Sequence, residues 1–126
     1  MPDFTEARPS DLDPTEMSWF VHVLETIETL VPADYTALMT DDVTLRLPDG
    51  THLEGKAAVH AAFEASWPSL RSLVHDERAV HGDAHQVVHE ARVVTTLRDG
   101  TVSVADSTSW IDRAPDGRIS AARVYG

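Results

Sequence analysis

Four side chains in the second half of the chain could together carry out acid–base chemistry: His75, Glu90, Arg92 and Ser109. A carboxylate beside an imidazole fixes the tautomer of the ring and makes it more basic, so Glu90 would orient His75 as a general base or acid. Arg92 could bind a carboxylate or enolate oxygen of a substrate, or simply neutralise Glu90. Ser109 could donate a hydrogen bond to the same developing negative charge.

The strands that must position these side chains come last in the chain. Alternation of apolar and polar residues predicts antiparallel strands over residues 72–81, 84–98, 101–112 and 118–125. Gly82-Asp83 and Asp99-Gly100 are typical of two-residue hairpin turns. With such turns, His75 would lie opposite Glu90, Glu90 opposite Ser109, and Arg92 opposite Ser107.

Other interpretations of these residues stay open. Buried charges are normally paired, so a Glu–Arg–His network inside a small barrel could be purely structural. A Ser–His–acid nucleophile fits less well, because Glu90 would separate His75 from Ser109. His85 and His89 share a face but lie about 13 Å apart on a strand, too far to chelate one metal ion. We therefore expect neither a metal nor a cofactor.

Helices precede these strands. Apolar residues every three to four positions predict a helix over 15–31 and another from 55 to about 70, with a short helix at 33–39 and a strand at 43–47 between them. Helices on one face of an antiparallel sheet define an α+β domain. We expect a substrate pocket between the two layers, lined by Trp19, Phe20, Val23, Leu47, Val59, Phe63, Trp67, Val94, Ser107, Ile111 and Val124.

Length and charge limit the classes of partner. A chain of 126 residues fits one domain, here residues 15–126, preceded by a polar, proline-containing segment over 1–14 that we expect to be a flexible arm. The net charge of −11 argues against nucleic acids and anionic membrane surfaces as partners. The absence of cysteine excludes disulfides and thiolate chemistry. Without an apolar signal segment, we expect a cytoplasmic protein.

An ordered set of short motifs resembles the SnoaL-like family of the nuclear transport factor 2-like superfamily. These motifs are Tyr35-Thr-Ala-Leu-Met-Thr-Asp-Asp-Val43, Pro48-Asp-Gly50, Gly55-Lys-Ala-Ala-Val59, His75, Glu90 and Asp116-Gly-Arg-Ile119. The resemblance implies a cone-shaped α+β barrel, in which a curved, mostly antiparallel sheet wraps around three N-terminal helices. It also implies an apolar pocket and a homodimer that packs through the outer sheet face.

The same resemblance carries over few catalytic positions. The general base of ketosteroid isomerase corresponds to Leu47 and its oxyanion-hole acid to Ser109. The Arg-x-Asp pair of limonene epoxide hydrolase corresponds to Glu90 and Arg92, in reversed order. We therefore expect an apolar small molecule as the partner and an acid/base enzyme (a cyclase, isomerase or hydratase) for a polyketide-like or terpenoid-like substrate. The alternative is a non-catalytic ligand-binding or subunit-interaction module of the same fold.

Overall fold

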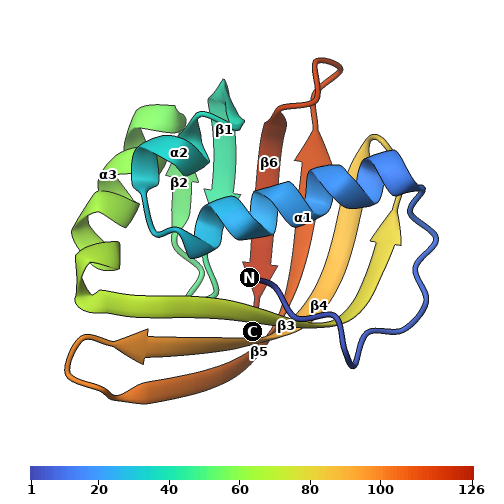
Figure 1. The fold of residues 1–126 in the computed structure, drawn as a ribbon. Helices are drawn as coiled ribbons and strands as arrows, with labels where there is room; N and C mark the ends of the chain where they lie inside the picture. Colours follow the sequence, from blue (N-terminus) through green and yellow to red (C-terminus); the bar gives the residue numbers. More distant parts are fainter.

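A computed structural model describes all 126 residues of the chain as a layer of helices over one curved sheet (Figure 1). The helical elements are α1 (Pro14–Glu28), α2 (Pro32–Thr36), α3 (Lys56–Ser66) and the single 3₁₀ turn η1 (Trp67–Ser69). The strands are β1 (Met39–Arg46), β2 (His52–Glu54), β3 (Leu70–Gly82), β4 (Gln86–Leu97), β5 (Val102–Arg113) and β6 (Ile119–Tyr125). The expected α+β class and the curved, mostly antiparallel sheet are thus confirmed. No helix is long and apolar enough to cross a membrane.

The six strands form one open sheet in the order β2-β1-β6-β5-β4-β3. Strands β3 to β6 make the expected antiparallel meander, and only the β1–β6 pair is parallel. The long strands β3, β4 and β5 bend, so that their ends near Leu70, Leu97 and Val102 pass beneath the helices (Figure 1). This curvature creates a concave face toward the helices and a convex face away from them.

Neither hairpin loop is the one predicted, and this changes the register. After β4, Gly100 N–H donates to the Leu97 carbonyl and Leu97 N–H donates to the Thr101 carbonyl, so the loop contains three residues. Gly100 has φ +91°, which only glycine adopts easily, as a three-residue hairpin loop requires at this position. Arg92 therefore pairs with Asp106 rather than with Ser107. An Asp-Gly pair fits both loop lengths, so the sequence alone could not distinguish them.

The β3–β4 hairpin departs further from the prediction. Its turn lies two residues later than predicted, since Asp83 N–H donates to the Gln86 carbonyl and residues 84 and 85 form the loop. A bulge at Arg78 then moves the pairing back by one residue. As a result His75 lies opposite Val93, not Glu90. The predicted pairs His75–Glu90 and Glu90–Ser109 are both wrong.

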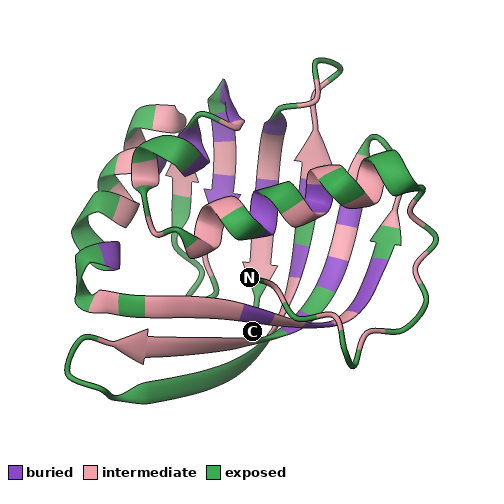
Figure 2. Ribbon diagram, viewed as in Figure 1, coloured by how far each residue is buried: buried purple, intermediate pink, exposed green.

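The core lies between α1 and the concave face. Asp13 caps α1 through a reciprocal pair of hydrogen bonds with Glu16, and Pro14 occupies the first turn. The cap fixes the residue at which the helix begins. With the helical period, this start places Phe20, Val23 and Leu24 on the side that faces the sheet, where they are at most 1% exposed. Buried residues accordingly follow the inner side of α1 and of the strands beneath it (Figure 2).

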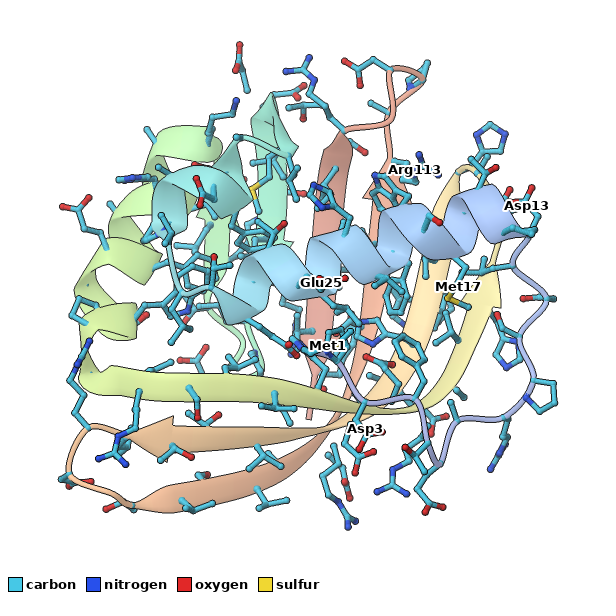
Figure 3. All side chains as sticks on the ribbon, in the orientation of Figure 1. Met1, Asp3, Asp13, Met17, Glu25 and Arg113 are labelled. Atoms are coloured by element: carbon cyan, nitrogen blue, oxygen red, sulfur yellow. The ribbon has the colours of Figure 1, made fainter.

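Residues 1–13, in the segment that we expected to be a flexible arm, lie along the outer edge of β3, where Asp3 pairs with Asp76. Asp3 N–H donates to the His75 carbonyl, and Glu77 N–H donates to the Asp3 carbonyl, both at 2.8 Å. Figure 3 shows Asp3 beside β3 and Met1 between α1 and β3. The segment thus covers a strand edge that would otherwise be unpaired, and it binds the backbone of two residues of the site described below.

Candidate functional site

A cavity of about 320 Å³ lies between the helices and the concave face of the sheet. Thirteen of its twenty lining residues are hydrophobic, so an apolar molecule could desolvate most of its surface there. The helical side of the wall is formed by Leu24, Ile27, Tyr35, Phe63 and Trp67. The polar lining groups are few, and two of them are histidines on adjacent strands, His75 on β3 and His89 on β4.

His75 is anchored by a carboxylate from α1. Its Nδ1 lies 2.9 Å from Glu28 Oε2, and the same oxygen accepts the His75 backbone N–H at 2.7 Å. The Met1 amino group lies 2.8 Å from Glu28 Oε1. Burial alone would raise the Glu28 pKa, but the hydrogen bonds from His75 and the Met1 amino group outweigh it and hold this pKa below its usual value. An ionised carboxylate only accepts, so Nδ1 of His75 carries the proton and Nε2 is the free nitrogen.

The Glu28 carboxylate gives a testable pH dependence of stability. A carboxyl whose pKa is lower in the folded state stabilises the fold above its usual value of 4.5, and this contribution is lost as the pH falls through the folded-state pKa. We expect the unfolding free energy of the wild type to fall more steeply below that value than that of Glu28→Gln. Urea unfolding of both proteins across this pH range measures the difference, and parallel pH profiles would contradict the ion-pair assignment.

His89 is anchored in the same way by a second carboxylate. Its Nδ1 lies 3.0 and 3.1 Å from the two oxygens of Glu77, whose side chain is 0% exposed. The Phe20 ring packs against the imidazole at an interplanar angle of 66°, with ring centroids 4.8 Å apart. The ring is therefore held both by a hydrogen bond and by packing, and its tautomer is controlled by a carboxylate with no other partner.

The two carboxylate-bound histidines face one cavity together. Their ring centroids are 6.3 Å apart. No protein group binds Nε2 of either ring, and neither atom is fully enclosed, so both nitrogens are open to the cavity. Ser109 lies opposite His89 in the β4–β5 register and also lines the cavity. The arrangement offers two proton-transfer groups and a hydroxyl donor at one place in an apolar wall.

Of the four residues predicted to be catalytic, His75 and Ser109 line this cavity, whereas Glu90 and Arg92 do not. The changed register turns Glu90 and Arg92 to the convex face, where both are exposed. Arg92 Nε there lies 3.0 Å from Asp106 Oδ1. Both side chains border a polar hollow of about 420 Å³ on that face. The carboxylates that bind and orient the histidines are those of Glu28 and Glu77, and not that of Glu90 as predicted.

The predicted pocket residues also divide into two groups. The cavity is lined by Leu47, Phe63, Trp67, Ser107, Ile111 and Val124. The remaining five, which are absent from its wall, are Trp19, Phe20, Val23, Val59 and Val94.

The five residues outside the wall have other surroundings. Phe20, Val23 and Val59 are 0% exposed and belong to the solid core. Trp19 packs under the Arg113 guanidinium at 4.0 Å, and Arg113 lies beside α1 (Figure 3). Val94 pairs with the exposed Val104, because β4 presents Val93 to the cavity instead.

Sequence reasoning missed Glu28, His89 and Tyr35 as residues of the site. One signal for Glu28 was available: a carboxylate at the last residue of a helix is disfavoured by the helix dipole, so it needs a compensating partner. His89 precedes Glu90 on the same strand, so the register error that turned Glu90 toward the cavity turned His89 away from it. No three His, Asp or Glu side chains are grouped so as to hold a metal ion.

The fold and its apolar cavity define a class of cone-shaped α+β proteins, and comparison with known proteins gives the family. The SnoaL-like domain model matches residues 20–122. The chain therefore belongs to the SnoaL-like family. No curated protein sequence matches it.

Solved structures of similar fold have low sequence identity to this chain. RV0760c from Mycobacterium tuberculosis, in complex with estradiol-17beta-hemisuccinate, has a TM-score of 0.74 and 20% identity over 87% of this chain and 92% of its own. A structure named as a SnoaL-like polyketide cyclase from Shewanella denitrificans has a TM-score of 0.77 and 10% identity over 90% of both chains. Delta 5-3-ketosteroid isomerase from Mycobacterium sp. has a TM-score of 0.75 and 21% identity over 87% and 91%. At these identities the likeness concerns the fold.

Proposed function

We propose that this protein binds an apolar small molecule in the cavity and catalyses proton transfer on it, as a cyclase, isomerase or hydratase of a polyketide-like or terpenoid-like substrate. One observation carries the proposal: two histidines, each bound to a buried carboxylate through Nδ1, present free Nε2 atoms to an apolar cavity. A neutral imidazole in this arrangement accepts a proton at Nε2 while the carboxylate stabilises the imidazolium that forms.

The proton-transfer step can be written for a ketone substrate. Nε2 of His75 or His89 removes a proton from the carbon next to the carbonyl, and the C–H electron pair moves into the enolate. The Ser109 hydroxyl donates to the enolate oxygen, in the role we first gave to Arg92 and Ser109 together. The imidazolium then returns a proton to the same or a conjugated carbon, so that base and acid are regenerated.

The size and lining of the cavity support this substrate class. Its 320 Å³ corresponds to the liquid volume of about ten water molecules. A molecule of one or two fused rings fits this volume. The names of similar structures include a steroid ligand and enzymes of ketosteroids and polyketides, whose carbonyl groups acidify neighbouring C–H bonds.

A non-catalytic ligand-binding module is the second candidate. The two Glu–His pairs also tie α1 to β3 and β3 to β4, which is the task of a structural network. In that case the cavity would bind the same kind of ligand without catalysing a reaction on it.

A cytoplasmic location stays a prediction. We further propose a homodimer that packs through the convex face of the sheet. The exposed apolar residues of β5 and β6 gather on this face: Val102, Val104, Trp110 and Tyr125. Sedimentation equilibrium should give twice the chain mass of 13.8 kDa, and a monomer at high concentration would contradict this proposal.

Binding and exchange of 2-tetralone test the main proposal. This ketone fits a cavity of this size and has acidic C–H bonds next to its carbonyl. We expect saturable binding by calorimetry and protein-catalysed exchange of those protons in D₂O, followed by ¹H NMR against protein-free buffer. Binding without exchange would favour the second candidate, and no binding would contradict both.

A further inference from the structure

Tyr35 forms part of an aromatic wall at the helical side of the cavity. Its ring lies 5.7 Å from Phe63 and 6.0 Å from Trp67, and the Phe63 and Trp67 rings stack at 4.4 Å with an interplanar angle of 28°. All three side chains line the cavity. Flat apolar faces of this kind favour a planar ring in the ligand.

The Tyr35 hydroxyl has no partner in the protein. The residue is only 7% exposed, no side-chain or backbone group hydrogen-bonds to its oxygen, and that oxygen is not sealed in the core. A tyrosine hydroxyl in a largely buried residue normally finds a hydrogen-bond partner. Because this one is accessible and its residue lines the cavity, a molecule bound there can supply the partner. Burial raises the pKa of Tyr35 to about 12, so the group stays protonated and able to donate.

We infer that the Tyr35 hydroxyl binds the ligand, by donating a hydrogen bond to an oxygen carried at the end of the ligand that lies against the aromatic wall. This inference rests on the proposed function, because it requires that the cavity bind a small molecule. It narrows the ligand class to a planar ring system with two oxygen groups, one facing the histidines and the other facing Tyr35.

The position of Tyr35 in the fold separates it from the other polar groups. Tyr35 belongs to α2, whereas His75, His89 and Ser109 belong to strands β3, β4 and β5. Figure 1 shows α2 in the helical layer and these strands in the sheet. A ligand that occupies the cavity therefore meets proton-transfer groups from one layer and a neutral hydroxyl donor from the other. Such a donor would select ligands by their oxygen at that end and fix which carbon faces the histidines.

A cycle of two proteins and two ligands tests this inference. The ligands are 2-tetralone and 6-hydroxy-2-tetralone, which differ by one oxygen on the aromatic ring. The proteins are the wild type and Tyr35→Phe, which keeps the ring and removes the hydroxyl. We expect the wild type to bind the hydroxylated ligand about 3- to 10-fold more tightly than 2-tetralone, and Tyr35→Phe to lose that preference. Ser107→Ala removes a hydroxyl on the sheet side of the cavity, and this variant should keep the preference for the hydroxylated ligand.

Each outcome has a distinct meaning. If Tyr35→Phe keeps the affinity ratio of the wild type, the Tyr35 hydroxyl does not touch the ligand and the inference is wrong, while the proposed function stands. If Ser107→Ala loses the preference and Tyr35→Phe keeps it, the second oxygen lies at the sheet. If the wild type binds neither ligand, the proposed function fails and the inference fails with it. Unchanged binding of 2-tetralone to Tyr35→Phe shows that the variant is folded.

Discussion

Replacement of His89 by Gln is expected to lower the rate of proton exchange in 2-tetralone by about 10²- to 10⁴-fold, the usual contribution of a positioned acid or base. The glutamine amide can donate to Glu77 in place of Nδ1, so the buried carboxylate keeps a partner and the fold is retained. ¹H NMR measures the exchange rate, and urea unfolding measures the stability of the same samples. We expect His75→Gln to act in the same direction.

Two further variants separate catalysis from structure. His22→Gln changes an exposed histidine of α1 and should leave the exchange rate unchanged. Glu77→Gln should lower the rate although it leaves both rings in place, because an amide that donates to Nδ1 forces the proton onto Nε2, where the base must act. A His89→Gln protein that exchanges at the wild-type rate but loses several kcal/mol of stability would show that the pair is structural.

Replacement of Phe20 by Ala is expected to cost about 3–5 kcal/mol of unfolding free energy, the range measured for large aromatic residues in cores. Phe20 is 0% exposed and packs between Phe4, at 6.4 Å, and His89, at 4.8 Å. For a chain of this length the loss corresponds to a fall in Tm of roughly 10–20 °C. Thermal unfolding followed by circular dichroism measures it.

Phe4→Ala is the matched control for Phe20→Ala. Phe4 contacts the same ring but is only half-buried, so truncation leaves a site that solvent can fill. Its expected cost is well below that of Phe20→Ala. Equal losses for the two variants would mean that the N-terminal segment is as firmly packed as the core, contrary to the burial of these two rings.

The faces of the strands show how far sequence reasoning reached. His75 and Ser109 were placed correctly on the concave face, because β3 and β5 alternate as predicted. The two faces of β4, the strand between them, were interchanged in the prediction: in the structure His89 points inward and Glu90 outward. Side chains alternate with a period of two, so a register error of one residue exchanges the two faces of a strand completely.

What the sequence determined by itself was the class of fold, the order of its elements and their approximate bounds, because apolar periodicity and turn residues act over short distances along the chain. Only the tertiary structure decided which carboxylates meet which histidines. Glu28 reaches His75 across 47 positions of sequence, and Glu77 meets His89 only because of a bulge and a turn that lies two residues later than predicted. Such contacts depend on loop length and on helix placement, and a local pattern specifies neither. Of the four residues considered first, His75 and Ser109 therefore lie on the concave face, for which acid–base chemistry is proposed. Glu90 and Arg92 lie on the convex face.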